Sequence, residues 1–394
     1  MDALQKKLLP LAGHRPLLHR LRLPYLLIVP GLLAIATIAL LGFHSDLNIA
    51  ALYSQCHARS RLRWVSRVPI VGAPSCFLTS FFQLAVGGGD GDSGDSHHHH
   101  SSSVRALAIM SVVLSFVAAL LTVNLVESAR LCNRRSWLIA RPTVPWLVFN
   151  LIGGALVWDI VIVPEFLRRA KHVQAAKESA AAERLRDVDS FIDLEVRGLT
   201  SQVEVVAIPL AVLLGFVAPS AAMLVTVGHP IAVVVWLFFP LWVSLVRYAV
   251  KVVGVNAIRD PEPHRLESHQ ISLGLMYAVP VVCSIASHVF LLVNLFGSPD
   301  DRREMTRATT KFIQIDFLII GATFLYWLLV EAGMLTTAVM IVSSVVLGPG
   351  AGLCGSWLLR EKAIERYPHG EGGERAAAAG DQQEHDEESP LLRP

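Results

Sequence analysis

The sequence predicts an all-α fold, a multi-spanning transmembrane helical bundle with about eight spans. Of its 394 residues 53% are hydrophobic and 17% are charged, whereas a soluble domain carries roughly 25% charged residues. Mean hydropathy is +0.51, and the apolar runs are about as long as a bilayer crossing requires. The runs lack strand-like alternation, so helices must satisfy the backbone in lipid. This composition excludes a typical soluble enzyme and a disordered chain.

Eight apolar runs define the predicted spans, and a ninth run is ambiguous. Proline interrupts the ninth run, residues 68–86, at two positions, which predicts a short re-entrant or interfacial piece, with a true span as the alternative. The first run is too long for a signal-peptide core and no small-residue cleavage site follows it, so we expect a retained anchor. The eight predicted spans are residues 23–43, 106–126, 144–163, 205–227, 230–246, 271–296, 312–330 and 332–359.

The runs divide the chain into a basic N-terminal segment (1–22), a transmembrane domain (23–359) and an acidic disordered tail (360–394). The loop 87–103 is a low-complexity spacer with four consecutive histidines. The charged loop 165–202 is predicted to form an amphipathic helix outside the membrane. Lysine and arginine counts favour neither side of the membrane, and both ends are expected in the cytosol. We expect an integral multi-pass protein of the endoplasmic reticulum or another endomembrane.

Motifs for cofactors and metals are absent from the sequence. No Walker loop, GxGxxG, HExxH or GxSxG occurs, and five cysteines without a CxxC pair suggest neither a disulfide framework nor a zinc site. The carboxylate-rich runs 300–304 and 187–193 lie in charged loops interleaved with arginine, so we interpret them as solvated faces. We therefore expect no cofactor and no metal. With a net charge of +2 we expect no nucleic acid partner.

Two carboxyl groups inside predicted spans are the first functional candidates, because an ionisable group in lipid is costly. Helical spacing places Asp316 on one face with Thr323 and Trp327, and Asp159 follows Trp158 directly. Each aspartate either fixes packing through a polar partner or serves the function. We expect both to face a shared interior cavity.

Other titratable groups are weaker candidates. Glu165 lies just beyond Asp159 in sequence and is the third candidate acid. His288 is deeply embedded and is either a packing residue or a proton donor. Glu127, Glu204 and Glu331 lie at span ends, where we expect structural roles.

Tryptophans supply the second functional signal. Trp158, Trp236, Trp242 and Trp327 are candidate substrate-binding residues. They form either interfacial belts, the common use of tryptophan in membranes, or a cavity whose aromatic faces stabilise a carbocation.

Four segments, residues 68–85, 158–167, 271–292 and 311–329, resemble the fungal membrane-bound terpene cyclases of meroterpenoid pathways, the ascofuranone type. The resemblance implies an isomerase- or lyase-type enzyme that cyclises a farnesyl-type chain on an aromatic or quinone-like head. Protonation of a terminal epoxide or olefin starts such a reaction, without metal or loss of diphosphate. The implied partners are a prenylated aromatic substrate, the lipid bilayer, and a pathway epoxidase and prenyltransferase.

For this reaction Asp316 is the preferred general acid, with Asp159 and Glu165 as the other catalytic candidates. Desolvation disfavours the charged form of a carboxyl group, so a buried one can keep its proton near neutral pH. Two other functions stay open. In a proton-coupled transporter the aspartates would bind protons or a cation, and in a non-catalytic scaffold the charged loop would dock a partner.

Overall fold

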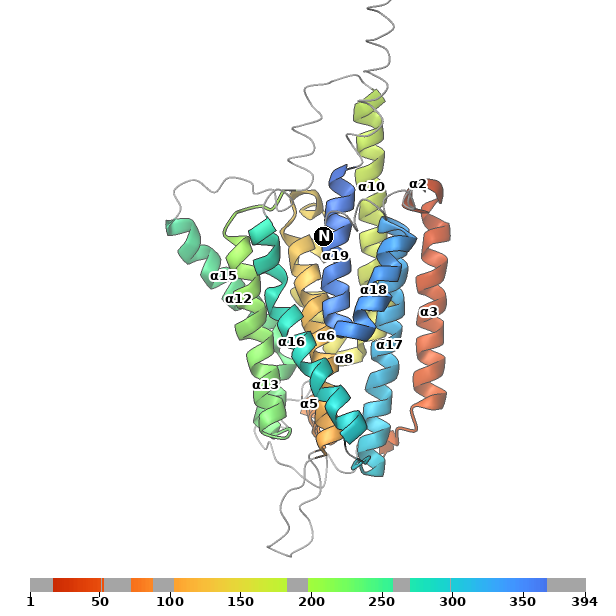
Figure 1. Ribbon diagram of the computed structural model, residues 1–394, viewed down its shortest axis with the longest axis vertical. Helices are drawn as coiled ribbons and strands as arrows, with labels where there is room; N and C mark the ends of the chain where they lie inside the picture. Colours follow the sequence, from red (N-terminus) through yellow and green to blue (C-terminus); the bar gives the residue numbers. More distant parts are fainter. Residues whose placement is uncertain are drawn as a thin grey trace, which may run out of the picture.

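The computed structural model describes residues 17–50, 52, 72–87, 103–182, 198–257, 270–297 and 299–366. Within these residues the regular elements are helices, and the one bridge outside named strands joins Arg130 to Leu199. Long helices lie side by side in a bundle (Figure 1). The predicted all-α membrane fold is therefore confirmed.

Five helical segments of the described chain are long and apolar enough to cross a membrane, and a bent pair makes a sixth. The bend of 60° separates the two members of this pair and lies next to Pro240. The five segments are α3 (Leu23–His44), α6 (Val104–Ala129), α12 (Glu204–Val212) continued by η4 (Leu213–Val217) and α13 (Ala218–Val225), α16 (Gln270–Gly297) and α17 (Glu304–Ala332), and the bent pair is α14 (Pro230–Leu237) with α15 (Phe239–Ala257). The predicted number of eight is not confirmed.

The predicted span 144–163 is instead a re-entrant hairpin, which we call the first hairpin. Helix α8 (Thr143–Ile152) ends at Gly153, whose φ of +124° lies where L side chains are disfavoured. The chain then returns through α9 (Gly154–Val157), η3 (Trp158–Ile162) and α10 (Val163–Ala182). Ser136, before α8, donates to Glu165, beyond η3, at 2.5 Å. Both arms therefore meet at the same side of the bundle.

The predicted span 332–359 is a second hairpin of the same kind. Helix α18 (Met334–Leu347) stops at Gly348, with φ +97°, and α19 (Pro349–Arg366) follows. Glu331, before α18, pairs with Arg360, near the end of α19. An apolar run gives the length of a segment but not its direction, so a run that reverses at a glycine has the same sequence pattern as a crossing. With the bent pair taken as one span, six crossings and two hairpins account for the eight runs.

The ninth run forms a short helix, α5 (Gly72–Ala85). Its 14 residues extend about 21 Å, less than the roughly 30 Å of a hydrocarbon core, so the described helix does not span. Phe81 of α5 packs edge-on against Phe312 of α17, with ring centroids 5.5 Å apart. Cys76 is disulfide-bonded. The number and spacing of the cysteines do not predict this bond.

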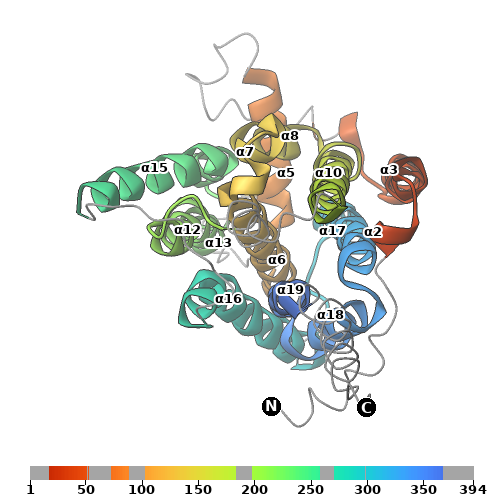
Figure 2. The ribbon, with the colours of Figure 1, turned by 90° about the horizontal axis from the view of Figure 1, so that it is seen from above.

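The corrected topology gives the bundle an orientation. The described chain ends, α2 (Leu17–Arg20) and the end of α19, lie at the same end of the bundle as α10 (Figure 1). Fifteen of the 20 lysines and arginines in the described ranges lie there. The other five are at the opposite end: Arg105, Arg302, Arg303, Arg307 and Lys311. The positive-inside rule indicates that the α10 end is cytosolic. Viewed along the bundle, α6 is surrounded by the other helices (Figure 2).

The predicted loops are described only in part. Helix α10 runs to Ala182, so the helix predicted within 165–202 exists over that stretch. Helix α19 continues to Arg366, past the predicted domain end at residue 359. The low-complexity spacer beyond Gly87, the carboxylate-rich run 187–193 and most of both chain ends lie outside the described residues.

Candidate functional site

The two predicted aspartates meet at one interface, where α17 packs against the first hairpin. The backbone N–H of Ala155 donates to Oδ1 of Asp316, at 2.9 Å. In return, the hydroxyl of Thr323, two turns after Asp316 on α17, donates to Oδ1 of Asp159 in η3. Each element thus supplies a carboxyl group that the other one binds. Both aspartates lie where the hairpin is held to α17.

Asp316 caps the returning arm of the first hairpin. Ala155 and Gly154, the first residues after the Gly153 turn, direct backbone N–H groups at its carboxyl group. These N–H groups have no partner inside their own helix, and the helix dipole favours a negative charge beside them. A Cβ on Gly154 would lie 2.8 Å from Oδ2 of Asp316 and 2.5 Å from the Phe149 ring. The close approach of carboxyl and backbone therefore requires glycine at this position.

Asp159 lies 1% exposed between two threonine hydroxyls. Thr37 of α3 contacts its Oδ2 at 3.2 Å, and Thr323 contacts its Oδ1. Each hydroxyl also contacts a carbonyl of its own helix, at 2.8 Å for Thr37 and 2.9 Å for Thr323. Each hydroxyl carries one hydrogen. If Asp159 is ionised, the two hydroxyls supply two hydrogens for these four contacts. If Asp159 is protonated, its own hydrogen brings the number to three. The contacts favour a protonated Asp159.

Glu165 does not join the two aspartates. It lies six residues beyond Asp159, roughly 9 Å along a helix, at the cytosolic end of the hairpin. Its carboxylate accepts the hydrogen bond from Ser136 and pairs with Arg168 at 2.9 Å. Glu165 thus belongs to a separate polar site at the membrane surface.

The four predicted tryptophans are divided between core and surface. Trp158 is fully buried, with its ring 6.0 Å from that of Trp146. Trp327 is 1% exposed and its indole N–H donates to Glu331. Trp236 is buried and donates to Ser220. Trp242 is 39% exposed on α15 and donates to the carbonyl of Val235, so it lies on the outside of the bundle.

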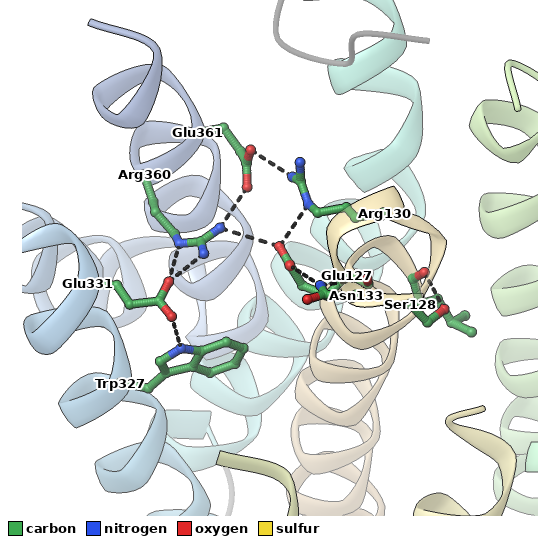
Figure 3. A network of polar contacts seen from close by, with 9 residues as sticks. Glu127, Ser128, Arg130, Asn133, Trp327, Glu331, Arg360 and Glu361 are labelled. Atoms are coloured by element: carbon green, nitrogen blue, oxygen red, sulfur yellow. Dashed lines mark hydrogen bonds and ion pairs between the residues drawn. The ribbon is translucent and has the colours of Figure 1, made fainter. Parts of the chain in front are cut away.

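A buried charge network closes the cytosolic end above Trp327 (Figure 3). Arg360 of α19 pairs with Glu331 of α17, and with Glu127 of α6 at 3.3 Å. Arg130 joins Glu127 at 3.0 Å and Glu361 at 2.7 Å. These contacts tie the second hairpin to α6 and α17. The expected structural roles of the span-end glutamates fit this arrangement, whereas the two arginines and Glu361 gave no sequence signal beyond their charge.

Glu204 forms a smaller network beside it. The Glu204 carboxylate pairs with Arg247 at 2.8 Å and with Lys251 at 2.7 Å. Arg247 also donates to the hydroxyl of Ser128. The carboxylate of Glu204 is fully buried, and removal of its cationic partners would leave a buried charge without compensation. The network joins α12, α15 and α6 at the cytosolic end.

Three further groups from the sequence analysis have local structural partners. Asp300 pairs with Arg302 at 2.9 Å and Arg307 at 3.3 Å, and the hydrogen bonds from Arg302 hold the pKa of this carboxyl well below its usual range. Asp301 accepts from Val104 at 2.7 Å at the start of α6. His288 contacts the carbonyl of Val345 at 3.0 Å. None of these groups contacts Asp159 or Asp316 in the described part of the chain.

Fold and site together define a multi-spanning membrane protein with two carboxyl groups at a re-entrant hairpin. The family model of the CtvD domain matches residues 77–298, and because this match covers more than half of the chain, the protein belongs to that family. Membership indicates a cyclase-like biosynthetic enzyme of a meroterpenoid pathway. The match includes Asp159 and ends before Asp316. No curated protein and no solved structure matches the chain.

Proposed function

We propose that the protein is a membrane-bound terpene cyclase of the ascofuranone type. It takes a prenylated aromatic compound from the bilayer, protonates its terminal epoxide or olefin, and closes rings through carbocations. The observation that carries this proposal is the pair of carboxyl groups at the first hairpin, one of them capped by backbone N–H groups and the other held by two hydroxyls. Family membership supports the reaction class.

Asp316 is the general acid in this proposal. Its carboxyl gives a proton to the epoxide oxygen or the olefin, and the N–H groups of Gly154 and Ala155 stabilise the carboxylate that remains. For an epoxide, the C–O bond breaks as the neighbouring double bond of the prenyl chain attacks the developing cation and forms the first ring. The last cation loses a proton to the same carboxylate, so the reaction is an isomerisation without a consumed co-reactant.

Asp159 is a positioning residue that keeps its proton. A neutral Asp159 adds no negative charge beside the carboxylate of Asp316, and its two threonine partners hold α3 and α17 against the hairpin. Two carboxyl groups in different surroundings thus take different roles. Trp158 and Trp327, on the same elements, supply the aromatic faces that stabilise a cation.

The reaction is tested with membranes that contain the full chain and a farnesylated phenol, supplied with or without a terminal epoxide. The expected result is a cyclic product from one of the two substrates, identified by mass and by nuclear magnetic resonance. Membranes from cells without the protein are the control. If both substrates remain linear, the cyclase proposal fails.

A proton-coupled transporter is the second candidate, and one observation favours it. Broken helices whose half-helix N-termini point into the membrane form the binding sites of many transporters, and Gly154 begins such a half-helix beside Asp316. Proton uptake by liposomes containing the protein, driven by a prenylated phenol gradient, would support transport. Cyclisation in detergent, where no gradient exists, supports the enzyme.

A further inference from the structure

A polar pocket of about 190 Å³ lies at the cytosolic end of the first hairpin. Its walls come from the segment after α6 and from the first turns of α10. The pocket has no part in the proposed cyclisation, because Asp159 and Asp316 do not line it. Its lining residues are Arg135, Ser136, Glu165, Arg168, Arg169 and His172.

The pocket has an excess of positive charge. Three arginines face one carboxylate, that of Glu165, which Ser136 and Arg168 already satisfy. Arg169 is fixed by its hydrogen bond to the carbonyl of Cys132, at 2.6 Å. Arg135 is exposed and has no ion-pair partner among the described residues. The guanidinium groups that remain available match an anion with several oxygens, since arginine binds phosphate through two parallel N–H bonds.

The pocket also lies at the depth of lipid headgroups. Trp137, directly after Ser136, is 52% exposed, and exposed tryptophans mark the membrane–water interface. Helix α10 leaves the apolar bundle here and continues outward to Ala182 (Figure 1). The charge distribution assigns this end to the cytosolic leaflet, whose lipids carry negative headgroups.

We propose that this pocket binds the phosphate headgroup of an anionic membrane lipid. The lipid phosphate lies between Arg135 and Arg168, and its acyl chains extend along the outer surface of the first hairpin. Glu165 positions Arg168 in this site. The bound lipid thereby holds α10 to the segment after α6 at the membrane surface.

The test is native mass spectrometry of the purified full chain in detergent, titrated with short-chain phosphatidic acid. Phosphatidylcholine of the same chain length and free glycerol phosphate are the comparison ligands. Variants are Arg135→Gln, Arg168→Gln and the matched control Arg141→Gln, an exposed arginine on the same side that does not line the pocket. Binding is read without reference to enzymatic activity.

We expect phosphatidic acid to bind more tightly than phosphatidylcholine, and each pocket variant to weaken it by roughly fivefold, from the contribution of one arginine near an anionic surface. Arg141→Gln should bind like the wild type. Equal binding of both lipids, or equal losses in pocket and control variants, would overturn the proposal. Glycerol phosphate binding as tightly as phosphatidic acid would identify a site for soluble phosphates instead.

Discussion

Replacement of Gly154 by alanine is the sharpest perturbation of the hairpin site. The added Cβ would lie 2.5 Å from Cζ of Phe149 and 2.8 Å from Oδ2 of Asp316. Both distances are shorter than a van der Waals contact of a Cβ atom. Phe149 packs against Trp146 at a centroid distance of 4.7 Å, so the ring has little room to retreat. The carboxyl of Asp316 must therefore move as well. Overpacking of this kind costs about 1–3 kcal/mol in stability.

The effect on turnover should exceed the effect on folding. Displacement of a catalytic group by about 1 Å lowers rates by roughly 100-fold, and we expect a loss of that size in cyclisation by Gly154→Ala. Gly321→Ala is the matched control, because Gly321 lies on α17 near Asp316 and nothing lies within 4 Å of its added Cβ. Product formation by equal amounts of membrane-inserted protein is measured, with the thermal midpoint in detergent as the folding readout.

Normal turnover by Gly154→Ala would refute the reasoning, because it would mean that the contact between the hairpin tip and Asp316 does not set the geometry of the acid. A loss shared by Gly321→Ala would point to α17 in general rather than to this contact.

The remaining predictions concern stability. Arg360→Met leaves the carboxylates of Glu331 and Glu127 without their shared cation, so it should destabilise the protein by about 3–5 kcal/mol and lower the thermal midpoint, while Arg141→Met at an exposed site should not. Asp300→Asn should lower stability at neutral pH by less than about 1 kcal/mol, because the paired carboxylate is partly exposed. Since Arg302 lowers the pKa of Asp300, this difference should persist at neutral pH and disappear only as the pH falls below the usual carboxyl value of 3.8. A difference that grows on acidification would contradict the pairing.

The membrane class and the helices could be predicted because long charge-free runs have few other uses in a chain. The number of crossings could not, because a glycine such as Gly153 or Gly348 reverses the chain without interrupting its hydrophobicity. For the same reason the sequence alone does not give the orientation in the membrane. When the two ends of each hairpin are placed on the same side of the membrane, most lysines and arginines of the described chain lie on that side.

The candidate aspartates were predictable, because a carboxyl group in an apolar run needs a reason to be there. The groups that bind these aspartates were harder to predict. Thr323 was placed on the face of Asp316, but its bond to Asp159 depends on how α17 packs against η3. Thr37 gives no signal in the sequence, because a threonine in a helix usually bonds its own backbone. The backbone N–H of Ala155 gives none either, because every residue other than proline has one.

The separation of roles between the two aspartates is the central claim, and turnover of Asp316→Asn compared with Asp159→Asn tests it most directly. Asparagine keeps the shape of either side chain but has no acidic proton. We predict that Asp316→Asn lowers cyclisation by roughly 100- to 10,000-fold, the contribution of general acid catalysis. Asp159→Asn, which still donates and accepts between two hydroxyls, should retain most activity, as should the surface control Asp46→Asn. Near-normal turnover by Asp316→Asn would contradict the account.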